Sequence, residues 1–374
     1  MATIEQASGL GSDPLTLRRA VERHLRERDP HLRVIAVHAI GSDTPVADPT
    51  YKASGYGVPL LVVARSLGDE RRYVLHFFGA NGHGHERGSD RVAEALLAAD
   101  TYPRVLGHVK PVDVGVIDAV GRWVSLAHTG EPFLLTEWRD GSLDVEELRA
   151  LAERGEATGD DRERVRAMVR YLERLHVSVP HDGTTYLRAV RDMVGHGEGV
   201  FGILDGYPRD VPAAPTERLR AIERAVVDWR WKLKERAERL RRIHGDFHPF
   251  NVLFDADGEV VVLDASRGSL GEPADDLAAM AVNYVFFALD RPHGWSRGFG
   301  VLWRDLFDGY LAAVRDPGVL EVIAPHLAWR ALVLASPRWY PKLSAAGRDR
   351  LLRLAEEALR EPRFDPVFAE ELMR

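Results

Sequence analysis

The pattern of apolar and polar residues predicts a small antiparallel sheet in the first part of the chain. Residues 60–64 and 73–78 are apolar runs that flank a polar turn at residues 68–70. Two short apolar runs around a polar turn are typical of a β-hairpin. Residues 32–40 have the composition of a further strand. We therefore expect a sheet that begins with these three segments.

Two helices and more strands complete the pattern before residue 137. Asp13-Pro14 and the apolar spacing that follows predict an opening helix within residues 1–30. Residues 90–99 predict a second helix, with Leu97 on its inner face. Further strands are expected at residues 105–116, 123–126 and 132–136, the last of them buried.

Beyond residue 137 the apolar residues recur at helical spacing. The expected helices cover residues 161–176, 216–241, 298–315, 319–335 and 344–360. Residues 181–215 are rich in Gly, Pro and Asp, so we expect an irregular substrate-side segment there. The change of pattern predicts an N-terminal lobe at residues 1–137 and a C-terminal lobe at residues 138–374. The fold class is α+β, with a small mixed lobe and a larger, mainly helical lobe.

Composition narrows the class of protein. The chain has 374 residues, of which 45% are hydrophobic and 29% charged, as in ordinary globular proteins. It has no cysteine, which excludes disulfides, thiolate zinc sites and cysteine nucleophiles. A net charge of −7 gives no overall attraction to nucleic acid. No apolar run approaches the roughly 20 residues that span a bilayer, so we expect no membrane partner and a cytoplasmic location. The oligomeric state is left open.

The residues with the clearest chemistry lie in one segment. Residues 244–251 read His-Gly-Asp-Phe-His-Pro-Phe-Asn, and Asp264 follows the second of two short apolar runs. Asp246 and Asn251 are separated by four residues, as in the kinase loop pattern H-R-D-x-x-x-x-N. Phosphoryl transfer needs a carboxylate at the acceptor hydroxyl and hard oxygen ligands for Mg²⁺. We therefore predict Asp246 as the base or hydroxyl-orienting group, and Asn251 and Asp264 as magnesium ligands.

The run from Ile243 to Ala278 resembles the aminoglycoside phosphotransferase and choline kinase-like superfamily, which shares the protein-kinase fold. The resemblance implies ATP and Mg²⁺ as cofactors and a hydroxyl of a small molecule as the acceptor. An aminoglycoside or other amino sugar is the leading acceptor class, with an amino alcohol or a nucleoside as alternatives. The resemblance also implies that Asp276 supports the catalytic loop and does not react.

Candidate nucleotide-binding residues lie in the first lobe and at its end. Gly55 and Gly57, at the mouth of the hairpin, would let backbone amides approach a phosphate, although they could also simply shape a turn. Residues 133–137 resemble the strand and hinge where adenine binds in the superfamily. This resemblance makes Glu137 and Trp138 candidate nucleotide contacts.

The chain departs from the superfamily at one position. The second strand of the hairpin normally carries a lysine that pairs with the nucleotide phosphates and with a helix glutamate. Here His76 stands near that place, and no lysine lies between Lys52 and Lys110. His76 with Glu94 as its partner is the candidate replacement; Arg91 or Lys52 could also reach the phosphates. Loss of nucleotide binding would instead make the protein a catalytically weakened pseudokinase with a regulatory role.

Two other groups of residues have open interpretations. Acids within residues 181–215, including Glu198 and Asp205, either recognise a cationic substrate or are solvated loop charges. Trp229 continues the apolar stripe of its helix and is expected in the core, whereas Trp231 falls off that stripe.

Overall fold

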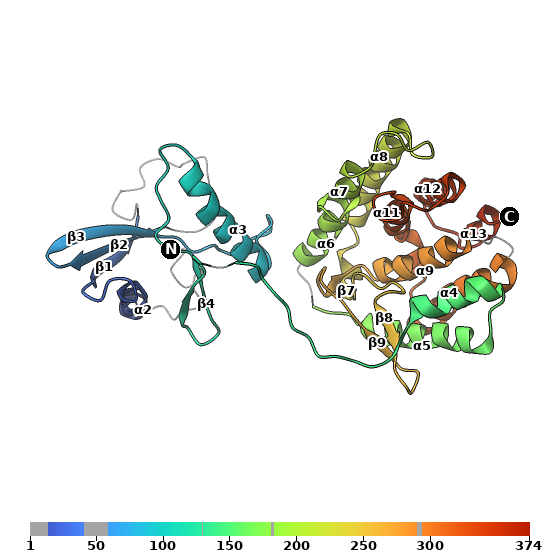
Figure 1. Ribbon diagram of the computed structural model, residues 1–374, viewed down its shortest axis with the longest axis horizontal. Helices are drawn as coiled ribbons and strands as arrows, with labels where there is room; N and C mark the ends of the chain where they lie inside the picture. Colours follow the sequence, from blue (N-terminus) through green and yellow to red (C-terminus); the bar gives the residue numbers. More distant parts are fainter. Residues whose placement is uncertain (1–13, 41–58, 129, 181–182, 290–293) are drawn as a thin grey trace. The chain divides into compact units, whose positions relative to one another are not determined.

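The computed structural model describes residues 14–40, 59–128, 130–180, 183–289 and 294–374. The chain divides into two compact units, Met1–Leu135 and Thr136–Arg374, which are described separately below (Figure 1). The sequence pattern placed the boundary at residue 137. The assignment of nucleotide binding to the first unit and catalysis to the second stays a prediction.

The first unit contains a three-stranded antiparallel sheet of order β1-β2-β3, formed by β1 (Arg33–Ala39), β2 (Leu60–Ser66) and β3 (Asp69–Leu75). The helix α2 (Pro14–Arg26) packs on it through Leu17 and Val21. These two side chains share a small core with Leu32, Val34, Leu60, Val62 and Ala64. The predicted hairpin, the strand before it and the opening helix are therefore confirmed.

The remainder of the first unit follows the sequence pattern only in part. The predicted second helix is present as α3 (Gly88–Thr101), but none of its described residues is buried and Leu97 is 65% exposed. The prediction that α3 buries an apolar face is therefore wrong. The 3₁₀ turn η1 (Tyr102–Arg104) follows. The strand β5 (Trp123–Ser125) pairs with β4 (Gly115–Ile117), as residues 123–126 predicted.

The strand predicted over residues 105–116 is wrong for most of its length, because β4 includes only its last two residues. Gly107 has a φ of 78°, which turns the chain, and Pro111 cannot donate a ladder hydrogen bond. The buried strand predicted at residues 132–136 is also wrong. Residues 130–141 form neither helix nor strand, and Phe133, Leu134 and Leu135 are 91%, 89% and 87% exposed.

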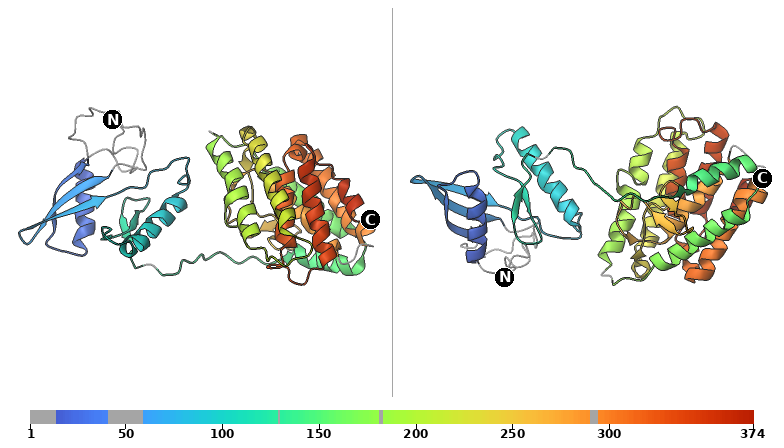
Figure 2. Two further views of the ribbon diagram at one scale, coloured as in Figure 1. Left: turned by 90° about the horizontal axis from the view of Figure 1, so that it is seen from above. Right: turned by 60° about the horizontal axis from the view of Figure 1, so that its bottom comes forward.

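The second unit is mainly helical, and Figure 2 shows its helices side by side from two directions. The helices predicted at residues 161–176, 298–315 and 344–360 are confirmed, with ends that shift by at most two residues. The helix predicted at residues 319–335 begins later, at Ala324, and the helix predicted at residues 216–241 ends early, at Leu233. The expectation of an irregular segment at residues 181–215 is wrong, because α6 and α7 lie within it. The helices are α4 (Asp144–Arg154), α5 (Gly159–Leu175), α6 (Thr184–Gly195), α7 (Val200–Asp205), α8 (Thr216–Leu233), α9 (Ala274–Ala288), α10 (Gly300–Val314), α11 (Ala324–Ala335), α12 (Ala345–Arg360) and α13 (Phe368–Leu372).

The helix α9 is the core element of this unit. Almost all of its side chains are buried, and it contacts α11, α10, α4 and α12. A helix that is apolar all round is stable only when other elements surround it. Its first turn carries two buried acids, Asp275 and Asp276, so the packing of α9 fixes their positions.

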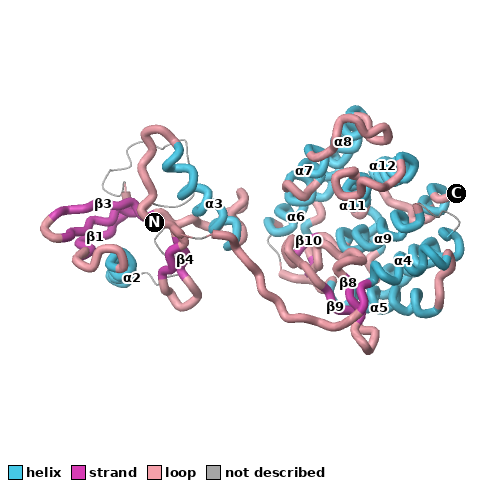
Figure 3. Tube along the Cα trace, viewed as in Figure 1, coloured by secondary structure: helices cyan, strands magenta, loops and turns pink. Residues whose placement is uncertain are grey.

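Two small sheets lie beside the helices (Figure 3). The strand β8 (Val252–Phe254) pairs with β6 (Ser142–Leu143) and β9 (Val260–Val262). The strand β7 (Arg241–Arg242) pairs with β10 (Leu270–Gly271). The α+β fold class is thereby confirmed. None of the helices in the described part of the chain has the length and apolarity to cross a membrane.

The buried acid Asp144, at the start of α4, predicts an unusual dependence of stability on pH. Burial raises the pKa of Asp144 from its ordinary value of 3.8 to about 7, although the charge of Arg164 opposes the shift. Within the described residues, its Oδ2 has no hydrogen-bond partner. Between these two pKa values the unfolded chain has released the proton and the folded chain still holds it, so stability falls as pH rises.

Asp144→Asn is therefore expected to raise the free energy of unfolding at pH 8 more than at pH 4. A shift from 3.8 to about 7 corresponds to at most about 4 kcal/mol. Urea denaturation at both pH values measures the difference. Asp160→Asn, at an exposed acid in the first turn of α5, is the matched control and should show no such trend. A gain that is equal at the two pH values would contradict this account.

Candidate active site

The predicted catalytic loop runs from β7 to β8 in the second unit. Gly245 has a φ of 82°, a left-handed conformation that a side chain would strain. Backbone bonds then close the turn: His248 N donates to Asp246 O at 3.0 Å, and Asn251 N donates to His248 O at 2.8 Å. This turn returns the chain directly into β8. The local sequence therefore fixes the positions of Asp246 and Asn251 relative to each other.

Asp276 supports this loop from the start of α9, which confirms the supporting role expected for it. Its fully buried carboxylate accepts hydrogen bonds from the backbone N–H groups of His244 and Gly245, both at 2.8 Å. The third contact, at 3.1 Å, is with Nε2 of His176. Burial acts to raise the pKa of Asp276, but the hydrogen bonds and the nearby His176 hold it below its ordinary value. The loop is therefore tied to a charged anchor in the core.

Asp246 is buried, with 8% of its surface exposed, and three basic side chains surround its carboxylate. Nη1 of Arg330 donates to Oδ1. Oδ2 faces Nη2 of Arg267 at 3.5 Å and Nε2 of His248 at 3.6 Å. Burial alone would raise the pKa of Asp246, but His248 and the two guanidinium charges hold it well below its usual range. The carboxylate is therefore ionised at neutral pH.

One candidate metal ligand, Asn251, contacts Asp246, and the other, Asp264, follows a residue that is bonded to Asn251. Nδ2 of Asn251 donates to the backbone oxygen of Asp246 at 3.1 Å. Leu263 N donates to Asn251 O at 2.9 Å, and this bond places the next residue, Asp264, near the loop. Asp264 is exposed and has a φ of 53°. A non-glycine residue in this conformation is strained, and such strain is common at functional sites.

This donor set fits Mg²⁺ bound together with phosphates. Mg²⁺ in such sites takes one or two protein oxygens, and phosphates and waters complete its shell. Asn251 and Asp264 offer that number. No cluster of three or more His, Cys, Asp or Glu residues suited to hold a metal occurs in the part of the chain that the structure describes.

Sequence analysis missed Arg330 and Arg267, which both contact Asp246. Arg330 comes from α11, where it is an arginine within an otherwise apolar run. A charged residue in a buried helix needs a partner, and this was the available signal. Arg267 follows Asp264 by three residues, and its Nε also lies 3.5 Å from Oε2 of Glu198. Both guanidinium groups lie over the ring of Trp329, at 4.0 Å for Arg330 and 5.1 Å for Arg267.

Four predicted nucleotide contacts lie away from this loop in the sequence. Gly55 and Gly57 are outside the described residues. Glu137 and Trp138 are exposed at the start of the second unit, and Trp138 is 84% exposed. Its Nε1 donates to Oδ1 of Asp140 at 2.9 Å. Their role in nucleotide binding stays a prediction.

The proposed lysine replacement lies in the first unit. His76 follows directly after β3, is exposed, and stacks on Phe78 with a ring separation of 5.2 Å. Glu94 lies on α3 and pairs with Nε2 of His85 at 2.8 Å. The predicted pair of His76 and Glu94 therefore has a competing partner in His85. Lys52, another candidate, is outside the described residues.

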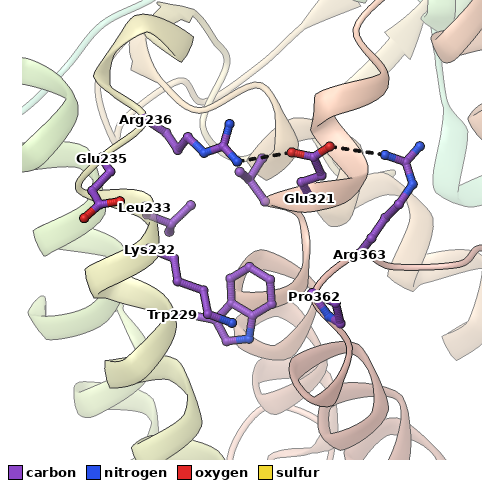
Figure 4. A pocket seen from close by; sticks show the side chains of 9 residues that line it. Trp229, Lys232, Leu233, Glu235, Arg236, Glu321, Pro362 and Arg363 are labelled. Atoms are coloured by element: carbon purple, nitrogen blue, oxygen red, sulfur yellow. Dashed lines mark hydrogen bonds and ion pairs between the residues drawn. The ribbon is translucent and has the colours of Figure 1, made fainter.

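A cleft of about 470 Å³ lies elsewhere in the second unit (Figure 4). Within it, Glu321 accepts from Arg236 at 3.2 Å and from Arg363 at 3.4 Å. Trp229 is 2% exposed and donates Nε1 to Leu359 O, which confirms its place in the core. None of the predicted site residues lines this cleft. Its lining residues are Trp229, Lys232, Leu233, Glu235, Arg236, Glu321, Val322, Pro362 and Arg363.

The comparison that decides the family covers most of the chain. The sequence profile of the APH phosphotransferase enzyme family matches residues 57–316. The chain belongs to this family. Its α+β architecture is the kinase-like class that the sequence resemblance implied.

Solved structures similar to this phosphotransferase share little sequence with it. A glucosamine kinase in complex with glucosamine, ADP and inorganic phosphate is 18% identical, with a TM-score of 0.37. The similarity covers 58% of each chain, so it spans little more than half of that kinase. The choline kinase LicA from Streptococcus pneumoniae is 13% identical over 92% of this chain and 99% of its own, with a TM-score of 0.35. A macrolide 2'-phosphotransferase type I is 17% identical over 96% and 99%, with a TM-score of 0.30. No curated protein sequence matches the phosphotransferase.

Proposed function

We propose that the protein transfers a phosphoryl group from ATP, with Mg²⁺, to a hydroxyl of a small molecule. The observation that carries this proposal is the loop that holds Asp246 ionised in contact with Asn251, whose backbone is bonded to the residue before Asp264. Phosphoryl transfer depends on positioning and on charge neutralisation more than on covalent chemistry. An anchored carboxylate next to two oxygen ligands supplies both requirements.

In this proposal Asp246 orients the acceptor hydroxyl. Its low pKa makes it a weak base, because the arginines stabilise the ionised form. A weak base does not remove a hydroxyl proton before the phosphoryl group begins to move. It can accept a hydrogen bond from the hydroxyl and take the proton as the new O–P bond forms. Oδ2 has only longer contacts, with Arg267 and His248, and is the oxygen that we assign to this role.

Asn251 and Asp264 would hold Mg²⁺ through their side-chain oxygens. The ion, when bound, supplies positive charge against the phosphate oxygens. The two residues serve to place it at a fixed distance from the catalytic loop, because the bond from Leu263 N to Asn251 O links their two segments.

The acceptor class that we favour is an amino sugar or a related amine-bearing metabolite. Glu198 supports this choice, because its carboxylate lies 3.5 Å from Arg267, which itself contacts Asp246. Trp329 Nε1 donates to Glu198 O at 2.9 Å and fixes the local backbone. The Glu198 side chain is 63% exposed and is therefore accessible to an ammonium group.

Glu198→Gln is expected to raise the KM for an amine-bearing acceptor about two- to fivefold, the equivalent of a solvent-exposed ion pair. The kcat should change little, because Glu198 does not contact the reacting hydroxyl. Steady-state kinetics on one acceptor, with and without its amine, measure the effect. Asp205→Asn, at an exposed acid at the end of α7, is the control. Equal KM changes for the two acceptors would remove Glu198 from amine recognition.

Calorimetric titration with ATP and Mg²⁺ at millimolar concentration tests the proposed function. We expect binding that depends on Mg²⁺, followed by ADP release when a hydroxylated acceptor is added. Absence of nucleotide binding would overturn the proposal. The missing lysine in the first unit would then favour the alternative, a pseudokinase with a regulatory role.

A further inference from the structure

We propose that Arg330, held by Asp275, is a positioning residue that fixes the orientation of the Asp246 carboxylate. This inference rests on the proposed function, because it assigns Asp246 its role at the acceptor hydroxyl. Arg330 lies on α11, 84 residues along the chain from Asp246. It is therefore a tertiary contact that the loop motif itself does not contain.

Arg330 uses all three of its guanidinium nitrogens at the site. Nη1 donates to Asp246 Oδ1, and Nη2 donates to the backbone oxygen of Gly245 at 2.8 Å. Nε and Nη2 donate to Oδ1 of Asp275 at 3.1 and 2.6 Å. Only 6% of the Arg330 surface is exposed, so these bonds are protected from water. A planar guanidinium with its donors engaged in several directions has one available orientation.

This contact distinguishes the two oxygens of Asp246. Oδ1 is occupied by the buried Arg330, whereas Oδ2 faces longer contacts with Arg267 and His248. Rotation of the carboxylate about its last bond would break the bond to Arg330. Arg330 therefore leaves Oδ2 as the oxygen that can meet an acceptor hydroxyl.

Arg330 also holds the backbone of the loop at Gly245, which Asp276 contacts as well. The N–H of Gly245 donates to Asp276, and the carbonyl of Gly245 accepts from Arg330, each at 2.8 Å. Asp275 and Asp276 are consecutive residues in the first turn of α9. The first turn of α9 thus holds Gly245 in two ways. Asp276 accepts directly from the Gly245 N–H, and Asp275 binds Arg330, which donates to the Gly245 carbonyl.

Asp275 fixes the orientation of the Arg330 guanidinium. Its carboxylate accepts two bonds from the guanidinium, so Arg330 is shared between two buried acids. The ring of Trp329, 4.0 Å from the guanidinium carbon, covers one face of the group. A shift of about 1 Å in a reacting group can lower a rate about 10²-fold, so this rigidity has a direct catalytic value.

The test compares Arg330→Met with Arg239→Met. Arg239 is a matched control, because it is also a mostly buried arginine that bridges two acids, Glu272 and Asp316. We expect Arg330→Met to lower kcat about 10- to 100-fold, with the KM values for ATP and acceptor within about twofold of wild type. Arg330→Lys should restore part of kcat, whereas Arg239→Met should lose stability without a comparable loss of kcat. Equal kcat losses in the two methionine variants, or no loss in Arg330→Met, would overturn the inference.

A second readout does not need catalysis. Hydrogen exchange at the backbone amides of residues 244–251 should accelerate in Arg330→Met and stay unchanged in Arg239→Met. Unchanged exchange in Arg330→Met would overturn the inference even if no acceptor is found. The two proposals can fail separately. If wild-type protein phosphorylates no acceptor but exchange in the loop is faster in Arg330→Met than in wild type, only the proposed function is contradicted.

If Arg330→Met does not fold, Asp275→Asn provides the same test. It keeps the shape of the side chain and leaves Arg330 in place with a weaker anchor. We expect faster exchange in the loop and a kcat between those of wild type and an Arg330 variant. Wild-type exchange together with wild-type kcat in Asp275→Asn would contradict the role of the pair.

Discussion

Asp246→Asn is expected to lower kcat about 10²- to 10⁴-fold, the range for removal of a group that assists proton transfer. The asparagine oxygen can still accept the bond from Arg330, so the loop should keep its shape. The amide cannot accept the proton that leaves the acceptor hydroxyl. Calorimetric ATP affinity should therefore stay close to that of wild type while ADP release in the presence of acceptor almost disappears.

The control for this variant is Asp257→Asn, an exposed acid in the turn between β8 and β9. It removes the same charge a few residues from the loop and should leave kcat unchanged. If Asp246→Asn turns over at the wild-type rate, Asp246 has no part in the reaction. A loss of ATP binding in this variant would instead indicate that Asp246 acts on the nucleotide.

Asp276→Ala is expected to lower the free energy of unfolding by about 3–5 kcal/mol, the range for removing one partner from a buried, hydrogen-bonded charged group. The change leaves two buried N–H groups, those of His244 and Gly245, without their acceptor. It also leaves His176 beside an empty space. Urea denaturation monitored by tryptophan fluorescence measures the loss.

Asp305→Ala is the comparison for Asp276→Ala. Asp305 also pairs with a basic side chain, Arg162, but that pair lies at the surface and solvent screens it. A much smaller change in the urea midpoint is expected. Similar stability losses in the two variants would mean that the buried anchor under the catalytic loop contributes no more than a surface pair.

The proximity of the candidate catalytic residues could be predicted because they are close together in the sequence. Asp246 and Asn251 lie in one turn, and Asp264 is delivered by the adjoining hairpin. Gly245 lies at the bend of this loop, where the backbone has a left-handed conformation that glycine adopts easily. Local sequence is sufficient to bring these three residues close together, whereas the contacts that hold the loop in the fold come from Asp276 and Arg330, far along the chain.

The basic surroundings of Asp246 could not be predicted in the same way. Arg330 reaches Asp246 from a helix that packs on α9, and only the tertiary packing determines which acid it meets. The apolar residues around Arg330 in α11 offered a signal that it is buried, but they do not identify its partner. Against the effect of burial, the pKa of Asp246 is lowered by His248, from the loop itself, and by Arg330 and Arg267, so only part of this shift comes from the long-range contact.

The fold was predictable where apolar periodicity extends over many residues. The helices α5, α10, α11 and α12 have such patterns and lie where they were expected. Residues 184–195 were missed because the glycines and aspartates near their ends hid an apolar face that includes Val190, Met193 and Val194. The strand predicted at residues 132–136 is wrong for another reason. The backbone N–H and C=O groups of a strand need a neighbouring strand as hydrogen-bond partner, and an apolar run alone does not provide one.

The most direct test of the central claim is the product of the complete reaction. Wild-type protein, ATP and Mg²⁺ are incubated with a panel of amino sugars, amino alcohols and nucleosides and followed by ³¹P NMR. We expect a new phosphomonoester signal with one acceptor class, in equal amount to the ADP formed, and its loss in Asp246→Asn. Hydrolysis of ATP to inorganic phosphate alone, or no phosphomonoester with any acceptor despite ATP binding, would contradict the assignment of this protein as a small-molecule kinase.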